Sequence, residues 1–273
     1  MPSIAFIGAG NMAEAIARGV LRATLYQKQD VFAADPSPNR QRLFNEDLGV
    51  TCTADPAQAA AKADVVILAV KPFIIAEALQ QIAPALKPNA LIISIAAGIS
   101  CVFIEKTLDE AAASPTKRRV VRVMPNTPML AGKGMSAVAL GSHAGEQDLI
   151  AAERIFSSAG KTVRVAESAM DAVTAVSGSG PAYIFFLTEA LAQAGVAAGL
   201  TELQAGQLAR ETVIGAAVLM QQSKDAPAEL RRKVTTPNGT TQAAIETLQA
   251  GDFSGLMIKA IAAAAKRSKE LGK

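Results

Sequence analysis

The sequence has few of the side chains that most often carry chemistry in proteins. Its 273 residues include a single histidine, His143, which lies in the polar stretch GSHAGEQD. A single histidine argues against multi-histidine metal sites and against catalysis by a histidine-based triad. We therefore expect no metal site.

Cysteine is equally scarce. Cys52 and Cys101 are the two cysteines, and each lies in an apolar segment rather than in a CxxC spacing. Such cysteines are more often buried structural thiols than disulfide partners. The pattern predicts a protein of a reducing compartment, the cytoplasm.

The chain also lacks a strong charge and long apolar runs. It has 27 Lys plus Arg and 24 Asp plus Glu, a formal net charge of +3. Nucleic-acid-binding proteins concentrate basic residues on one face, whereas short runs such as KRR at 117–119 are typical of solvated surface. No uncharged run approaches the roughly 20 residues of a membrane span, and the N-terminus does not resemble a signal peptide. Neither a nucleic acid nor a membrane is an expected partner.

A glycine-rich motif near the N-terminus points to a nucleotide. The apolar run IAFIG leads into GAGNMA, and the helical pattern EAIARGVL follows. In the spacing G-x-G-x-x-A, the first glycine permits a tight turn, the second allows a pyrophosphate to approach the backbone, and the alanine allows close helix packing. Phosphate would rest on the N-terminus of the helix. The predicted cofactor-binding residues here are Gly8, Ala9, Gly10, Asn11, Met12 and Ala13.

Further apolar runs of strand length recur in the first half: DVFAAD, ADVVILAVKP, ALIISIAAG and RRVVRVMPNTP. Continuous rather than alternating apolar runs indicate strands covered on both faces, as in a parallel sheet. The sequence therefore predicts a doubly wound, Rossmann-type α/β domain over residues 1–165. Ligands of such sheets lie beyond the carboxyl ends of the strands, which adds these cofactor-binding candidates: Ala69, Val70, Lys71, Pro72, Ala96, Ala97, Gly98, Pro125 and Asn126.

The residues after the second predicted strand leave the cofactor open. Asp35 stands where an acidic residue holds the ribose hydroxyls of NAD and repels the additional phosphate of NADP. However, Ser37, Asn39 and Arg40 follow within one turn and could hold a 2′-phosphate. Both NADPH and NADH are therefore retained as cofactors.

The second half reads as helices. After Lys161 to Val165 we predict helices over Ala182–Ala198, over Glu202–Gln222 with Thr201 as cap, over Pro227–Lys233, and twice more after residue 241. Several are apolar on more than one face, which is typical of buried helices. We predict an all-helical domain over residues 166–273 that forms a homodimer. The sequence leaves open whether dimers assemble into a larger ring.

The stretch VTTPNGTT, residues 234–241, joins two of these helices. Pro237 fixes a turn, Asn238 or Gly239 can take a positive φ, and the next helix begins with Gly239, Thr240 and Thr241. Amides and hydroxyls meeting at one point would suit a small carboxylate. The alternative is a turn whose helix is capped by a threonine.

Taken together, the motifs resemble the pyrroline-5-carboxylate reductase family over essentially the whole chain. The matching segments are FIGAGNMAEAI, LAVKP, ISIAAG, RVMPNTP, DAVTAVSGSGPAYIFFLTEAL and VTTPNGTTQAAIETL. The last differs from the usual SPGGTT, since Thr236 replaces Ser and Asn238 replaces Gly. Asp55-Pro56 stands where some relatives carry a cofactor-contacting Asn.

The resemblance implies a reductase that delivers hydride from NADPH or NADH to the C=N carbon of 1-pyrroline-5-carboxylate and yields L-proline, the last step of proline biosynthesis. It implies that the amides of Gly239, Thr240 and Thr241 hold the substrate carboxylate, with Val234 and Thr236 in the same site, and that the Thr241 hydroxyl bonds the ring nitrogen as the catalytic group. Pro125, Asn126 and the segment Ala96 to Gly98 would flank the nicotinamide.

The sequence is also compatible with two other functions. A 3-hydroxyacid-dehydrogenase-like oxidoreductase commonly needs a lysine on the helix after SGSGP, and that helix contains none. A non-catalytic dimeric NAD(P) sensor would bind a cofactor without turnover. Activity on related cyclic imines and regulation by proline are not decided by the sequence.

Overall fold

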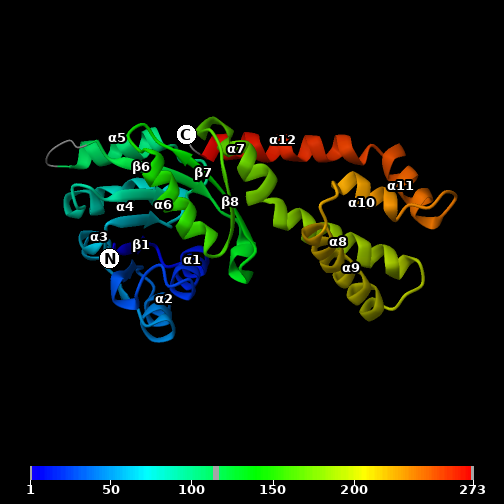
Figure 1. Cartoon of the computed structure of the whole chain (residues 1–273), viewed down its shortest axis with the longest axis horizontal. Helices are drawn as coiled ribbons and strands as arrows, with labels where there is room; N and C mark the ends of the chain where they lie inside the picture. Colours follow the sequence, from blue (N-terminus) through cyan, green and yellow to red (C-terminus); the bar gives the residue numbers. More distant parts are fainter. Residues whose placement is uncertain (1, 113–116, 272–273) are drawn as a thin grey trace. The chain divides into compact units, whose positions relative to one another are not determined.

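The computed structural model describes residues 2–112 and 117–271. The chain forms two compact units (Figure 1): residues 1–179 together with 263–273, and residues 180–262. The last strand ends at Arg164, where the sequence changes from strand-like to helical patterns. The predicted domain boundary at residue 165 stays a prediction.

The first unit is built on one eight-stranded sheet in the order β3-β2-β1-β4-β5-β6-β7-β8. Every neighbouring pair is parallel except β6 with β7, which is antiparallel. The predicted Rossmann-type α/β fold is thus confirmed, with two strands, β7 and β8, that run opposite to the other six. The strands are β1 (Ile4–Ile7), β2 (Val31–Ala34), β3 (Thr51–Thr53), β4 (Val65–Leu68), β5 (Leu91–Ser94), β6 (Arg119–Met124), β7 (Gly134–Leu140) and β8 (Gly160–Arg164).

Successive residues of the central strands face opposite layers of helices, so both faces of the sheet are buried. Ile4 and Phe6 of β1 pack in the core formed with α1 (Asn11–Arg22) and α6 (Glu146–Ser157). Ala5 and Ile7 pack in the core formed with α3 (Pro56–Lys62), α4 (Ile75–Ile82) and α5 (Cys101–Ala111). This two-sided burial explains why the strands read as continuous apolar runs.

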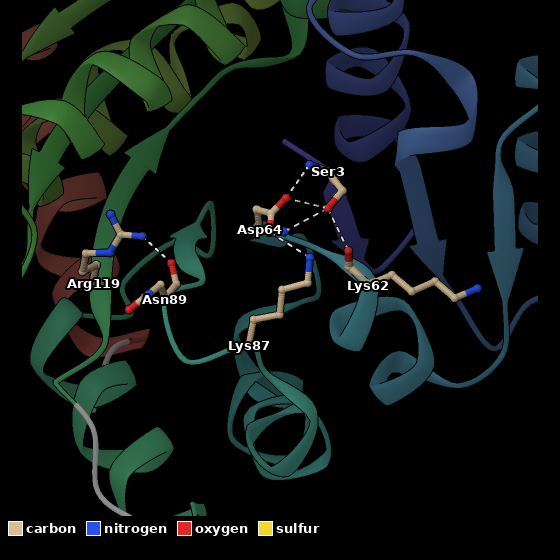
Figure 2. A network of polar contacts seen from close by, with 6 residues as sticks. All are labelled: Ser3, Lys62, Asp64, Lys87, Asn89 and Arg119. Atoms are coloured by element: carbon tan, nitrogen blue, oxygen red, sulfur yellow. Dashed lines mark hydrogen bonds and ion pairs between the residues drawn. The ribbon is translucent and has the colours of Figure 1, made fainter. Parts of the chain in front are cut away.

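The amino ends of the central strands are joined by polar contacts (Figure 2). Asp64, just before β4, accepts hydrogen bonds from the backbone N–H and the hydroxyl of Ser3 at 2.8 and 2.9 Å. Its other oxygen lies 2.7 Å from Lys87 Nζ. At the start of β6, Arg119 donates to the carbonyl of Asn89. These contacts therefore stabilise the sheet at the amino ends of its strands, opposite the carboxyl ends.

The second unit contains α8 (Gly180–Ala197), α9 (Glu202–Gln222), α10 (Pro227–Lys233), α11 (Thr240–Ala250) and the first part of α12 (Phe253–Leu271). The predicted bounds of α9 and α10 are confirmed, and Thr201 caps α9 by accepting from the Gln204 N–H. Helix α8 begins two residues before the predicted start. Throughout the part of the chain that the structure describes, no helix is long and apolar enough to span a membrane.

Large apolar side chains are exposed on this second unit. Phe186 of α8 is 72% exposed and Leu203 of α9 is 82% exposed, and each has apolar neighbours on the same helix. Exposed apolar side chains are typical of surfaces through which proteins associate.

Candidate active site

The turn between β1 and α1 has the geometry that a pyrophosphate requires. Gly8 has a φ of +94°, and a Cβ on it would lie 2.8 Å from the carbonyl oxygen of Ala69. Gly10 is the N-cap of α1, and no side chain caps this helix. A Cβ on Gly10 would meet no atom within 4 Å. The α1 N-terminus therefore faces open space, where its amides can receive an anion.

That space is a cavity of about 880 Å³ at the carboxyl ends of the strands. Residues that follow β1, β2, β4, β5 and β6 line it together, as expected for the ligand site of a doubly wound sheet. It therefore contains most of the predicted cofactor-binding residues: Gly8, Gly10, Asn11, Met12, Asp35, Ala69, Val70, Lys71, Pro72, Ala96, Ala97 and Pro125.

Asp35 connects the ends of β1 and β2. One carboxylate oxygen accepts from the backbone N–H of Ala9 at 2.8 Å, and the other accepts from the N–H of Ser37 at 2.9 Å. The side-chain amide of Gln41 donates to the Asp35 carbonyl at 2.7 Å. These bonds fix the Asp35 carboxylate at the wall of the cavity.

Arg40 lies outside the residues that line the cavity. Its Nε donates to the carbonyl of Ala9 at 2.5 Å, and a terminal nitrogen lies 2.9 Å from a carboxylate oxygen of Glu14. Burial opposes ionisation of Glu14, but its hydrogen bonds to Arg18 and Arg40 outweigh this effect, so the pKa of the carboxyl is lowered. The guanidinium of Arg40 therefore already has a carboxylate partner.

The other predicted cofactor residues outside the cavity lining are Ala9, Ala13, Ser37, Gly98 and Asn126. Ala9 and Ala13 are buried beneath the glycine turn. Asn126 is also largely buried: its oxygen accepts from the Met135 N–H at 2.9 Å, and its nitrogen donates to the Ser177 carbonyl at 3.0 Å. Asn126 thus ties the end of β6 to a π-helical turn, η7 (Thr174–Gly178).

The cavity also contains residues that we did not predict from the sequence. Ala54 follows β3, a strand of three residues that is too short to give a clear apolar run. Pro56 is the first residue of α3, and Asp55 caps this helix by accepting from the Ala57 N–H at 2.9 Å. The carboxyl-end rule applied to β3 would have found Ala54. Pro36 and Thr127 follow β2 and β6, so the carboxyl-end rule covers them, although neither was named as a cofactor-binding residue. The remainder have no sequence signal of their own: Ile7, Ala34, Ile74, Glu77, Ala78, Gln81, Ile95 and Met124.

Both cysteines are free and buried. Burial, reinforced by the negative charge of Asp35, raises the pKa of the Cys52 thiol to about 11. Burial and the neighbouring Glu167 carboxylate raise the pKa of Cys101 further. Since the thiolate is the reactive form, neither side chain has the character of a nucleophile.

In the second unit, the turn at residues 234–241 leaves a helix N-terminus without a side-chain cap. Asn238 has a φ of +58°, and Gly239, not a threonine, is the N-cap of α11. The threonine-cap alternative is therefore wrong. The Asn238 N–H donates to Gln242 Oε1 at 2.7 Å. A Cβ on Gly239 would lie 2.4 Å from Thr236 Oγ1, so this turn needs glycine there. Val234, Thr236 and Thr240 are exposed, and Thr241 is half-buried.

The glycine turn, the fixed Asp35 and the cavity define a dinucleotide-binding protein of the Rossmann class. Comparison with known proteins narrows this class. A family model described as "Pyrroline-5-carboxylate reductase dimerisation" matches residues 167–271, and one described as "NADP oxidoreductase coenzyme F420-dependent" matches residues 3–98. The chain is 43% identical to a pyrroline-5-carboxylate reductase of Pseudomonas aeruginosa, covering 99% of this chain and 97% of the relative. A Pisum sativum reductase of the same name is 40% identical, with coverages of 98% and 96%.

Solved structures agree. A pyrroline-5-carboxylate reductase from Coxiella burnetii has a TM-score of 0.90 at 37% identity, covering 100% of this chain and 99% of that one. A Plasmodium falciparum pyrroline carboxylate reductase with NADP bound has a TM-score of 0.85 at 29% identity, with coverages of 100% and 98%. The chain belongs to the pyrroline-5-carboxylate reductase family. This membership confirms the resemblance and displaces the hydroxyacid-dehydrogenase and sensor alternatives.

Proposed function

We propose that the chain is an NAD(P)H-dependent reductase that converts 1-pyrroline-5-carboxylate to L-proline. The observation that carries the proposal is the 880 Å³ cavity beside the uncapped α1 N-terminus in a chain 43% identical to a reductase of that name. NAD(P)H supplies the hydride when it is bound.

The residues of the cavity fit such a cofactor. The α1 N-terminus at Gly10 and Asn11 would hold the pyrophosphate, and Asp35, which lines the same cavity, would bind the adenosine ribose. Ala96, Ala97 and Pro125 at the ends of β5 and β6 would border the nicotinamide. Asn126 would support these residues without contacting the cofactor, since both polar groups of its side chain are bonded within the protein.

The substrate carboxylate would be held by the amides at the start of α11, in the turn that includes Val234, Thr236, Gly239, Thr240 and Thr241. An uncapped helix N-terminus supports this role, because its N–H groups need an acceptor. Thr241 would then orient the ring nitrogen through its hydroxyl. This part of the proposal comes from the resemblance of the turn to the family signature.

The reaction places modest demands on the protein. A cyclic iminium is a strong electrophile and can arrive already protonated, so the site needs no strong acid of its own. Positioning of the two reactants and exclusion of water can supply most of the rate enhancement. A site built from glycines, backbone amides and threonine hydroxyls suits this chemistry.

We also infer that the protein is a homodimer joined through its C-terminal helices, with a larger ring of dimers as a further level of assembly to be tested. The exposed apolar side chains of α8 and α9 support the dimer. The two free cysteines are consistent with the reducing conditions of the cytoplasm.

Steady-state assays of the purified chain with 1-pyrroline-5-carboxylate and either NADPH or NADH test the activity. Cofactor oxidation that matches proline formation mole for mole is the expected result. Cofactor binding without any proline formation would overturn the proposed function. Thr241→Val tests the proposed role of the Thr241 hydroxyl, and its matched control is Thr247→Val, because Thr247 is exposed on α11 and its hydroxyl donates to the carbonyl of Ala243.

A further inference from the structure

We propose that this enzyme prefers NADH to NADPH and that Asp35 is the residue that sets the preference. The inference rests on the proposed function for its physiological meaning. Its physical basis is the set of charges next to the end of β2, where a 2′-phosphate of NADPH would lie.

The first step is the position of the negative charge. Asp35 lines the cavity, and the N–H groups of Ala9 and Ser37 hold its carboxylate in place from behind. A carboxylate has about four acceptor sites, so two remain for ribose hydroxyls. A 2′-phosphate carries a charge of about −1.5 to −2 and would lie against this fixed negative group.

The second step is that Arg40, the one basic residue among residues 35–40, is already engaged. The Ser37 N–H donates to Asp35, and the Ser37 side chain does not line the cavity. Arg40 donates to the Ala9 carbonyl and pairs with Glu14, which also binds Arg18 at 2.9 Å. The Arg40 guanidinium also lies 5.9 Å from the centre of the buried Phe44 ring, a further contact within the protein.

The third step is the balance of charge around the cavity. Its lining contains Lys71 as the one basic residue, against the acidic residues Asp35 and Glu77. Lys71 follows β4, and β1 lies between β4 and β2 in the sheet. Among the residues that line the cavity, no basic side chain follows β2 to balance the charge of Asp35. The interaction of Asp35 with a 2′-phosphate is therefore repulsive.

Isothermal titration of the full-length protein with NADH and with NADPH, in the absence of imine, tests the preference directly. We expect NADH to bind at least about tenfold more tightly. Equal affinities, tighter binding of NADPH, or no binding of either cofactor would overturn the proposal. Because no substrate is present, this result is independent of whether the protein forms proline.

Three variants locate the cause. Asp35→Asn keeps the shape of the side chain and removes the charge, but it retains only one of the two acceptor oxygens that bind the Ala9 and Ser37 N–H groups. The readout is therefore the ratio of the two affinities, which should shift toward NADPH by roughly tenfold. Glu14→Gln leaves Asp35 intact and releases Arg40, so NADPH should bind more tightly while the affinity for NADH changes little.

Glu77→Gln is the matched control. It removes a negative charge from the same cavity away from β2, and the ratio of the NADH and NADPH affinities should stay as in the wild type. A Glu77→Gln shift equal to that of Asp35→Asn would contradict the role of Asp35.

Discussion

The carboxylate of Asp35 accepts a hydrogen bond from the backbone N–H of Ala9 at 2.8 Å, so the residue that follows β2 directly supports the glycine turn that follows β1. One side chain thus links the pyrophosphate and ribose ends of the predicted cofactor site. Replacing it should therefore affect both the discrimination between cofactors and the shape of the turn.

Two glycines of the same turn should respond differently to the same change. Gly8→Ala places a Cβ 2.8 Å from the Ala69 carbonyl at a φ of +94°, so we expect a loss of roughly 1–3 kcal/mol of stability. Gly10→Ala places its Cβ in open space, so unfolding should change by about 0.5 kcal/mol or less. Cofactor affinity should nevertheless fall roughly tenfold, because the methyl group occupies the place of the pyrophosphate. Thermal unfolding and cofactor titration distinguish these outcomes, and a stable Gly10→Ala with unchanged affinity would contradict the placement of the phosphates.

Removal of the Thr241 hydroxyl should impair catalysis. Thr241→Val keeps the shape of the side chain, so we expect kcat/KM for the imine to fall. The loss should correspond to about 1.5–3 kcal/mol of transition-state stabilisation, the range for one charge-assisted hydrogen bond. Cofactor affinity should not change. The control Thr247→Val alters the same helix on its exposed side and should leave both quantities as they were. Equal kinetics for wild type and Thr241→Val would rule out the proposed role.

The Ser3–Asp64–Lys87 contacts should contribute to stability in a pH-dependent way. The hydrogen bond from Lys87, with those from Ser3, lowers the pKa of the Asp64 carboxyl in the folded protein. A lowered pKa stabilises the fold above the pKa of the unfolded chain, about 3.9, and this stabilisation is lost as the pH falls through the folded-state pKa.

Asp64→Asn should therefore lower the free energy of unfolding at pH 7 by about 1 kcal/mol, a modest value because the pair is partly exposed. The difference from wild type should shrink in acid. Denaturant unfolding across this pH range measures it, and Glu110→Gln, which breaks an exposed pair with Lys106 at 3.7 Å, serves as the control. A difference that grows as the pH falls would contradict the assigned role.

The cysteines should be unreactive in the folded protein. Burial raises the pKa of Cys52 to about 11, so very little thiolate is present at neutral pH. A chromogenic thiol reagent at pH 7.5 should label both cysteines rapidly in denaturant and slowly in buffer. The raised pKa also destabilises the fold as the pH rises above the unfolded value of about 8.5. Rapid labelling of the native protein would contradict the burial of the two cysteines.

A charge on α8 should disrupt the dimer. Phe186 is 72% exposed, and Phe186→Asp would bury a carboxylate in an apolar interface. Light scattering should find a monomer. Phe73 is 85% exposed in the first unit, so Phe73→Asp tests whether any exposed phenylalanine has the same effect. A dimeric Phe186→Asp would place the interface elsewhere.

The sequence predicted the features that depend on neighbours along the chain. The glycine turn, the apolar strands and the bounds of α9 follow from local patterns such as the Thr201 cap. Strand β7 was not predicted: its small residues give no strong apolar run, and its antiparallel direction depends on pairing with β6. Short β3 was missed for the same reason, and Ala54 with it.

The side-chain partners were beyond local patterns. Arg40 is a plausible phosphate ligand in sequence, but Glu14, 26 residues earlier, is its partner in the structure. Asn126 looked like a nicotinamide neighbour, and its amide instead joins Met135 to Ser177, 51 residues later. Such pairings follow from packing, which a motif does not encode.

The most direct test of the reductase activity is isotope transfer. The protein would be incubated with 1-pyrroline-5-carboxylate and NADH deuterated at both C4 positions of the nicotinamide, and the proline examined by mass spectrometry and NMR. We predict one deuterium per proline, on the carbon that was doubly bonded to nitrogen. Unlabelled proline, or no proline from protein that binds the cofactor, would contradict hydride transfer to the imine carbon.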